Sequence, residues 1–250
     1  MKKHIFASDL DRTLIYSSHF LSQYVTEKPL MLVEYYKDQP LSYMTTYARK
    51  ILEEIQQYAY FVPVTTRTTI QYQRIFGITS LYPEYAITYN GAVVLKDGQP
   101  DKEWEQYIEK QTNPFYQEMF NYMKSIPQNK RYYDVTHFMY AINEDATQDD
   151  KHIPIAKRFG FTMSRQGRKL YFIPSHICKS HAVKYVSEQL NVRQIFGAGD
   201  ANLDVPFIKN ATTGVLMKHG GVSSTLTMTQ QVGVNATEEM LNKVIQFIHK

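Results

Sequence analysis

The stretch KHIFASDLDRTL, residues 3–14, joins an apolar run to two aspartates two positions apart. The apolar residues predict a buried strand, and a chain turning out of that strand can place Asp9 and Asp11 around one reacting phosphorus atom. Asp9 can then attack the phosphorus, while Asp11 protonates the leaving oxygen and later deprotonates water. Two carboxylates beside a phosphate repel one another, so this interpretation requires a cation such as Mg²⁺. The alternative is a strand-end turn with a helix cap.

Two later segments carry side chains suited to holding a phosphoryl group. The run FVPVTTR, residues 61–67, is typical of a second parallel strand that delivers Thr65 to a phosphate at its carboxyl end. Lys179 opens a predicted helix that continues to Leu190, and its ammonium could lie between the nucleophile and the phosphate. The alternative for this lysine is a solvated surface charge.

A third segment, QIFGAGDANLD at residues 194–204, combines an apolar strand with a glycine-rich turn. The turn ends in two acids, Asp200 and Asp204. Acids that follow a strand in such a turn are good ligands for a hard metal ion. The sequence therefore predicts a metal site after this strand.

Together these segments resemble the four motifs of the haloacid dehalogenase (HAD) superfamily of phosphohydrolases. The residues that carry the resemblance are, in chain order, Asp9, Asp11, Thr65, Lys179, Asp200 and Asp204. The segment ITYNGAVV, residues 87–94, resembles the Asn-Gly-Ala segment of the branch that includes Cof-type and sucrose-phosphatase-like enzymes. The resemblance implies an α/β fold: a doubly wound, Rossmann-like parallel-sheet core with an inserted, smaller α+β cap of type two.

The resemblance also implies a role for each matched residue. Asp9 is the expected nucleophile, Asp11 the general acid and base, and Thr65 and Lys179 the residues that hold the phosphoryl oxygens. The expected Mg²⁺ ligands are Asp9, Asp11, Asp200 and Asp204. The expected substrate-binding residues of the core are Thr66, Arg67, Asn90 and Gly91. From their position where the cap returns to the core, and not from the resemblance, Arg165, Arg168 and Lys169 are expected to face an anionic or hydroxyl-rich part of the substrate; the alternative is a solvated hairpin.

Two positions depart from the pattern of that branch. Thr66 stands where a glycine is common, and Leu203 stands where an asparagine is usual. Neither change removes a catalytic group. The second deletes a polar side chain that helps to order the metal site, so the site is expected to be weaker than in relatives or to be supported differently.

The apolar pattern predicts the domain organisation. We expect a core of residues 1–99 and 175–250 and a cap of residues 100–174 that covers the active site, as in the type-two cap. In the core we expect a hairpin flap at 29–43, helices at 44–60, 69–76 and 236–250, and a strand pair at 85–95; Gly77 is expected to end the second helix. In the cap we expect helices at 115–123 and 153–159 and strands at 138–142 and 170–173.

Composition argues against several other classes of protein. The 250 residues carry a net charge of +4, but the basic residues are scattered and show no recognition-helix or RNA-motif pattern, so no nucleic-acid partner is expected. No apolar run is long enough to span a bilayer or to act as a signal peptide, so no membrane partner is expected. A single cysteine, Cys178, agrees with a cytoplasmic location. No obligatory protein partner is evident.

The function that fits these features is a Mg²⁺-dependent phosphomonoesterase acting on a small phosphorylated metabolite, and the expected substrate class is a sugar phosphate. By analogy with its relatives, it would form an aspartyl-phosphate intermediate. Three alternatives stay open. A phosphomutase would use the same residues, a non-catalytic regulatory or binding protein could retain the fold, and a nucleic-acid-binding module would bind with a steep salt dependence.

Overall fold

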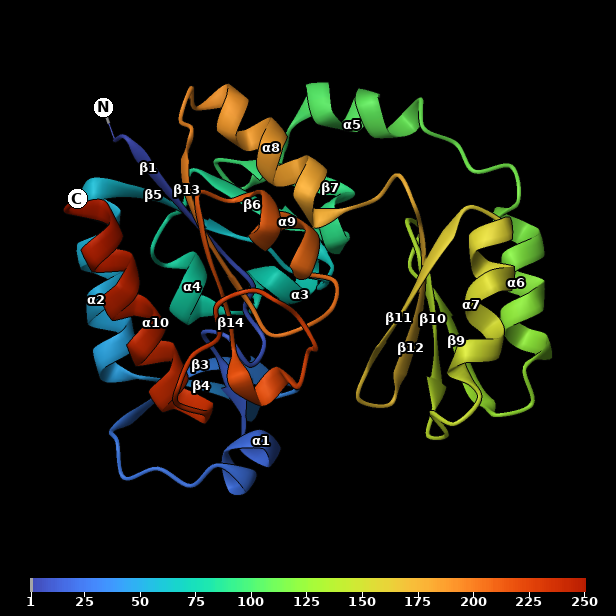
Figure 1. Cartoon of the computed structure of the whole chain (residues 1–250), viewed down its shortest axis with the longest axis horizontal. Helices are drawn as coiled ribbons and strands as arrows, with labels where there is room; N and C mark the ends of the chain where they lie inside the picture. Colours follow the sequence, from blue (N-terminus) through green and yellow to red (C-terminus); the bar gives the residue numbers. More distant parts are fainter. Residues whose placement is uncertain (1) are drawn as a thin grey trace. The chain divides into compact units, whose positions relative to one another are not determined.

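The computed structural model describes residues 2–250, and the chain forms two compact units (Figure 1). The first, here called the core unit, consists of Met1–Asp101 and Lys179–Lys250. The second, the inserted unit, consists of Lys102–Cys178. Each unit has its own sheet and its own apolar core.

A four-stranded parallel sheet forms the centre of the core unit. Its strand order is β14-β13-β1-β5, with β1 at His4–Ser8, β5 at Ala59–Pro63, β13 at Gln194–Gly199 and β14 at Thr213–Leu216. Helices α2 (Thr46–Tyr58) and α10 (Gly233–Ile248) lie on one face, and α8 (Lys179–Gln189) and α9 (Val205–Asn210) lie on the other (Figure 1). Strands covered on both faces read as continuous apolar runs, which is why β1 was recognisable in the sequence. The predicted α/β fold is confirmed.

Helix α2 shows how the sequence builds this layer. The Thr45 hydroxyl accepts a 3.0 Å hydrogen bond from the Ala48 N–H and so caps the first turn. Ile51, Leu52 and Ile55 follow at helical spacing and are buried. They join an apolar core that also contains the buried side of α10. The predicted helices at 44–60 and 236–250 are confirmed with slightly different ends.

The core unit carries two small antiparallel sheets. One has the order β2-β4-β3, and its hairpin of β3 and β4 confirms the predicted flap; its strands are β2 (Tyr16–Ser17), β3 (Leu30–Tyr36) and β4 (Gln39–Thr45). The other confirms the predicted strand pair and consists of β6 (Tyr85–Thr88), β7 (Val93–Lys96) and β8 (Gln99–Pro100). The remaining short elements are α1 (Ser18–Gln23), α3 (Thr69–Gln73), α4 (Phe76–Thr79) and the 3₁₀ turns η1 (Tyr89–Gly91) and η2 (Lys218–Gly220).

The predicted single helix at 69–76 is wrong. The chain forms α3, breaks after it, and continues as α4, so that Gly77 lies inside a helix instead of ending one. Gly77 is needed for close packing, because a Cβ at this position would lie 2.3 Å from Cγ1 of Val33 on β3. The glycine therefore lets α4 pack directly on the hairpin.

The inserted unit is an α+β module. Its antiparallel sheet has the order β11-β12-β10-β9, formed by β9 (Asn129–Asp134), β10 (Met139–Asn143), β11 (Phe161–Gln166) and β12 (Lys169–Pro174). Its helices are α5 (Lys102–Glu109), α6 (Tyr116–Ser125) and α7 (Asp149–Arg158). Met119, Met123 and Phe172 belong to its buried core. The predicted helices and strands are present here, whereas α5, β9 and β11 were not anticipated.

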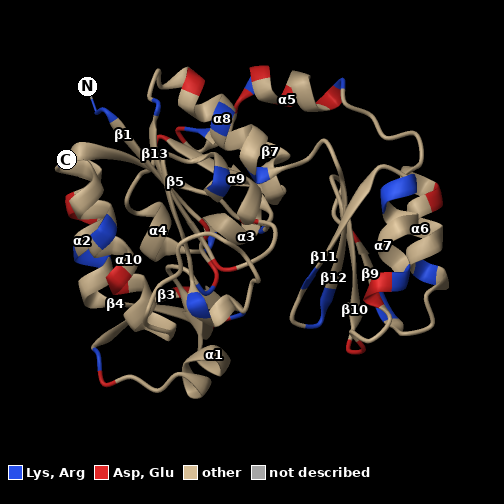
Figure 2. Ribbon diagram, in the orientation of Figure 1, with Lys and Arg blue, Asp and Glu red and all other residues tan. Residues whose placement is uncertain are grey.

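Charged residues are spread over both units. Figure 2 shows Lys and Arg side by side with Asp and Glu on many elements of the fold. This pattern agrees with the scattered basic residues in the sequence. Within the described part of the chain, no helix has the length and apolar character needed to cross a membrane.

Candidate active site

The predicted site residues of the core unit follow the carboxyl ends of neighbouring parallel strands. Asp9 comes directly after β1, Asp200 directly after β13, and Thr65 two residues after β5. Strand β1 pairs with both β5 and β13, so the three strand ends lie at one edge of the sheet. This edge is where open α/β sheets bind their ligands.

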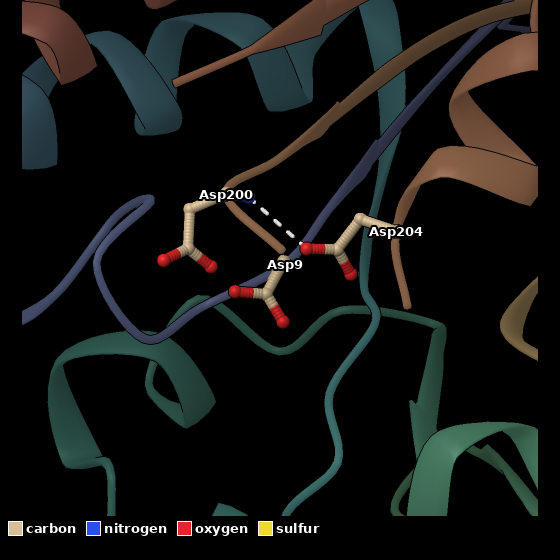
Figure 3. Close-up of side chains that lie close together, drawn as sticks. All are labelled: Asp9, Asp200 and Asp204. Carbon is tan, nitrogen blue, oxygen red and sulfur yellow. Dashed lines mark hydrogen bonds between the residues drawn. The ribbon is translucent and has the colours of Figure 1, made fainter. Parts of the chain in front are cut away.

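Three of the predicted acids form a buried cluster (Figure 3). Asp9, Asp200 and Asp204 each offer a carboxylate oxygen, and these oxygens lie within 4.8 Å of one another. The side chains point toward a common centre, and all three residues are buried. The carboxylate of Asp11, which was also expected as a metal ligand, does not belong to this cluster and is bonded elsewhere.

Lys179 provides the positive charge of the cluster. It is the first residue of α8, and its Nζ donates hydrogen bonds of 2.7 Å to Oδ1 of Asp9 and 2.6 Å to Oδ1 of Asp204. Burial alone would lower the lysine pKa, but the two carboxylates outweigh it and hold the pKa above its usual value. The ammonium therefore stays charged beside the expected nucleophile, and the alternative of a solvated surface lysine is wrong.

A tight turn after β13 fixes Asp204. Its Oδ2 accepts hydrogen bonds from the backbone N–H groups of Asp200 and Ala201, at 3.0 and 2.9 Å. The turn depends on Gly199, because a Cβ there would lie 2.5 Å from the Asp204 side chain. The glycine-rich sequence is thus required for the close approach of Asp204 to the end of the strand.

The electrostatics of the cluster fit a divalent cation. Burial is the main cause that raises the pKa of Asp9 to about 7, and the Asp204 and Asp11 carboxylates add to it while Lys179 opposes it. Burial likewise raises the pKa of Asp200 well above its usual value, and Asp9 and Asp204 add to that rise. Three carboxylates face one ammonium, so the ionised cluster has an excess of negative charge. Oxygen ligands around such a centre suit a hard cation.

Asp11 is held by Arg67. The Arg67 Nε donates to Oδ2 of Asp11 and a terminal nitrogen donates to Oδ1, both at 2.7 Å. This is a bidentate pair, the most directional contact between an arginine and a carboxylate. The Thr65 hydroxyl accepts a 3.1 Å hydrogen bond from the Arg67 N–H, which ties the Arg67 backbone to the end of β5. The structure thus places Arg67, expected as a substrate-binding residue, against the expected general acid.

The Asn-Gly turn at η1 also reaches this edge of the sheet. The Asn90 N–H donates a 3.0 Å hydrogen bond to the Thr65 carbonyl, and both Asn90 and Gly91 have positive φ angles, 57° and 103°. The Asn90 side-chain oxygen is buried and has no hydrogen-bond partner within residues 2–250. Such an atom is suited to a ligand that supplies a donor. Thr66, the other expected substrate-binding residue, is half-buried in the same loop.

The predicted residues of the inserted unit have different surroundings. Arg165 donates to both oxygens of Asp149 and to the carbonyls of Asn143 and Asp145, so its guanidinium holds the loop before α7. Arg168 has a 74 % exposed side chain near Glu144. The Lys169 ammonium lies 5.2 Å from the centre of the Tyr140 ring. Arg165 thus has a part in the structure of this unit that the sequence did not suggest.

Sequence reasoning missed two residues of the site. Glu34 on β3 is completely buried and bonds to Arg67. His219 donates to the carbonyl of Arg12 at 2.7 Å and accepts from the Gly233 N–H at 3.0 Å, so it supports the loop that carries Asp11. A signal existed for Glu34, because it is the only charged residue in the strand sequence LMLVEYY. The sequence offers no comparable signal for His219.

Comparisons with known proteins place the chain in a family. The family model described as sucrose-6F-phosphate phosphohydrolase matches residues 2–236. No curated protein sequence matches the chain. A sucrose-phosphatase from Synechocystis, solved with sucrose and phosphate, has a similar structure at 16 % identity and a TM-score of 0.67, covering 99 % of this chain and 98 % of that one.

Two further solved structures share the fold. One is a phosphatase of the HAD superfamily from Bacteroides thetaiotaomicron, at 14 % identity and a TM-score of 0.62, covering 98 % of this chain and 95 % of that one. The other is a trehalose-6-phosphate phosphatase related protein, at 14 % identity and a TM-score of 0.55, covering 98 % of this chain and 97 % of that one.

The fold, the acidic cluster and these similarities define a phosphatase of the HAD superfamily. Within that class, the chain belongs to the sucrose-6F-phosphate phosphohydrolase family. The predicted membership in the branch with sucrose-phosphatase-like enzymes is confirmed.

Proposed function

We propose that this phosphatase is a Mg²⁺-dependent phosphomonoesterase that hydrolyses a phosphorylated sugar through an aspartyl-phosphate. The observation that carries the proposal is the buried cluster of Asp9, Asp200 and Asp204, with the Lys179 ammonium bonded to two of its members. It brings a carboxylate nucleophile and fixed charges together at the ligand-binding edge of the sheet. That combination serves phosphoryl transfer.

The reaction has two chemical steps. In the first, Asp9 attacks the phosphorus, the bond to the sugar oxygen breaks, and Asp11 gives its proton to that oxygen. In the second, water attacks the same phosphorus, Asp11 takes the proton from the water, and the bond to Asp9 breaks to release phosphate. Lys179 stays positively charged throughout and stabilises the negative charge that moves between Asp9 and the phosphoryl oxygens.

The chain's own residues would hold the metal. Asp9, Asp200 and Asp204 are the candidate side-chain ligands, and their excess negative charge supports the choice of a divalent cation. When bound, Mg²⁺ would offset the charge of the phosphoryl group and the carboxylates. Thr65 and Asn90 follow the neighbouring strands and are proposed to contact the phosphoryl group or the adjoining part of the substrate.

The proposed substrate class rests on the family. The matching family is named for sucrose-6F-phosphate, and the Synechocystis sucrose-phosphatase was solved with sucrose and phosphate. A sugar phosphate is therefore the first class to test, with sucrose-6F-phosphate as its first member. The inserted unit is proposed to be a type-two cap that contributes to selection of the sugar.

The test is phosphate release by the purified chain. We expect release from a sugar phosphate with Mg²⁺, loss of release with a chelator, and recovery when Mg²⁺ is returned. Formation of an isomeric sugar phosphate without net phosphate release would indicate a phosphomutase. Absence of turnover on both sugar phosphates and an aryl phosphate would indicate a non-catalytic protein.

A further inference from the structure

A buried glutamate on the hairpin lies at the centre of a charge network. Glu34 is 0 % exposed. Its Oε1 accepts hydrogen bonds of 2.6 Å from Arg67 and 3.1 Å from Arg74, and its Oε2 accepts a 2.6 Å hydrogen bond from the Ser42 hydroxyl. A buried carboxylate is costly unless it is paired and hydrogen-bonded in this way. The network therefore explains how Glu34 remains inside the fold, but not why the chain places a charge there.

Arg67 connects this glutamate to the expected general acid. Its guanidinium donates hydrogen bonds from Nε and one terminal nitrogen to Asp11, and from the other terminal nitrogen to Glu34. Because these nitrogens belong to one rigid plane, the position of Glu34 restricts the orientation in which Arg67 meets Asp11. The Arg67 side chain is 13 % exposed, so solvent offers little alternative pairing.

A β-bulge in the hairpin directs the Glu34 side chain toward the interior. The pairing of β3 with β4 shifts register on both sides of Glu34, which marks a β-bulge. Val33 and Glu34 are consecutive and both buried, whereas an unbroken strand would direct them to opposite faces. Val33 packs against Gly77, and the Gly77 carbonyl accepts a 2.6 Å hydrogen bond from Arg49. The bulge and the packing of Val33 on Gly77 hold Glu34 where it bonds to Arg67.

We propose that Glu34 is a positioning residue for catalysis: it fixes the Arg67 guanidinium, and Arg67 in turn orients Asp11 for proton transfer. The hairpin is then part of the catalytic apparatus and not only a surface flap. This inference rests on the proposed function, because it assumes that Asp11 is the general acid and base.

The proposal predicts an effect that depends on the leaving group. An alkyl phosphate such as a sugar phosphate expels a strongly basic alkoxide and needs the proton from Asp11, whereas 4-nitrophenyl phosphate expels a weakly basic phenolate and needs it much less. Hydrolysis of the aspartyl-phosphate also uses Asp11 and is common to both substrates, so the leaving-group effect belongs to kcat/KM, which reports the steps up to release of the leaving group. Replacing Glu34 should therefore lower kcat/KM for the sugar phosphate more than kcat/KM for the aryl phosphate. A variant that only loosens the fold should slow both substrates equally.

The test compares Glu34→Gln with wild type on a sugar phosphate and on 4-nitrophenyl phosphate. We expect kcat/KM to fall at least about tenfold on the sugar phosphate and less than about threefold on the aryl phosphate, a fraction of what general acid catalysis usually contributes. Glu188→Gln is the control, because Glu188 lies near the end of α8 with a 63 % exposed side chain, pairs with Lys184, and touches neither Arg67 nor Asp11. It should leave both rates unchanged.

A double-mutant cycle locates the effect at Asp11. In an Asp11→Asn background, Glu34→Gln should change kcat/KM on the sugar phosphate by less than about twofold, because the group that it positions is already lost. Should Glu34→Gln fail to fold, Arg74→Gln provides the second variant. Arg74 is 30 % exposed and contacts Glu34 without touching Asp11, so it should give a smaller loss with the same leaving-group pattern.

Equal losses on both substrates, an undiminished loss in the Asp11→Asn background, or unchanged rates in Glu34→Gln would each overturn the proposal. These outcomes are distinct from failure of the proposed function. That failure would appear as inactivity of the wild type, or as full activity of Asp11→Asn.

Discussion

The Lys179 ammonium donates a 2.7 Å hydrogen bond to Oδ1 of Asp9, although 170 positions separate the two residues in the chain. Both side chains are buried, and Lys179 also bonds to Asp204. A charge in such a position is retained only when its partners compensate for lost hydration. Lys179 is therefore expected to contribute both to the stability of the core unit and to the reaction of Asp9.

Replacement of Lys179 tests this connection. Lys179→Met leaves two buried carboxylates without their ammonium, so in the absence of metal we expect a loss of about 3–5 kcal/mol in the free energy of unfolding. Turnover should also fall strongly. Urea unfolding and phosphate release measure the two effects. Lys184→Met, on the same helix but with a 76 % exposed side chain, should change neither; a similar loss in both variants would contradict the assigned role.

The raised pKa values of Asp9 and Asp200 predict a pH effect on metal-free protein. The pKa of Asp9 is about 7 in the folded protein and near 3.8 in the unfolded chain, so between these pH values the folded state holds a proton that the unfolded chain has released. The free energy of unfolding that comes from Asp9 is therefore present at low pH and is lost as the pH rises through this range. Asp200→Asn should therefore raise the melting temperature, and the gain should be larger at about pH 8 than at about pH 5. A gain that shrinks with rising pH would be inconsistent with the raised pKa values. Mg²⁺ should stabilise the wild type more than this variant.

Leu203 offers a test of how the metal site is supported. This residue is buried, precedes Asp204 in the chain, and stands where Cof-type and sucrose-phosphatase-like enzymes usually have an asparagine. If the missing amide leaves the site less ordered, Leu203→Asn should lower the Mg²⁺ concentration that gives half-maximal activity. Leu203→Ala, which removes the side chain without adding an amide, is the control. An unchanged or higher Mg²⁺ requirement in Leu203→Asn would mean that another residue already supplies the support.

A residue of the site could be predicted from the sequence when the pattern that marks it lies within a single helix or strand. The apolar patterns of the strands before Asp9 and Asp200 and of the helix that begins at Lys179 are visible in the sequence, so the meeting of these residues at one sheet edge could be predicted. Asp204 lies in the same glycine-rich turn as Asp200 and could be placed with it. The contact of Arg67 with Glu34 could not, because it depends on a bulge in β3 and on a tertiary contact between residues 33 positions apart. Local patterns do not contain such information.

Two errors in the fold have the same origin. Gly77 was interpreted as a helix stop, yet its place is decided by the side chain of Val33 on another element. Helix α5 was missed because only Trp104 and Ile108 are buried on it, which is too weak an apolar pattern to identify a helix. In both cases the missing information lies in contacts between elements.

The inserted unit provides a test of substrate selection. Arg168→Ala and Lys169→Ala should raise KM for the sugar phosphate and leave turnover of an aryl phosphate nearly unchanged, because only the sugar uses remote binding energy. Arg165→Ala should instead lower the melting temperature, since Arg165 holds Asp149 and backbone carbonyls. Steady-state kinetics and thermal unfolding separate these outcomes. Equal kinetic losses on both substrates would remove Arg168 and Lys169 from substrate selection.

The central claim is that Asp9 is the nucleophile. The measurement that tests it most directly is phosphate release by purified, folded Asp9→Asn with Mg²⁺ and saturating sugar phosphate, beside the wild type. The neutral amide cannot form the acyl phosphate and is a poorer metal ligand, so we predict no measurable turnover. Turnover above about a tenth of the wild-type rate would contradict the claim, because loss of a covalent nucleophile costs far more than tenfold.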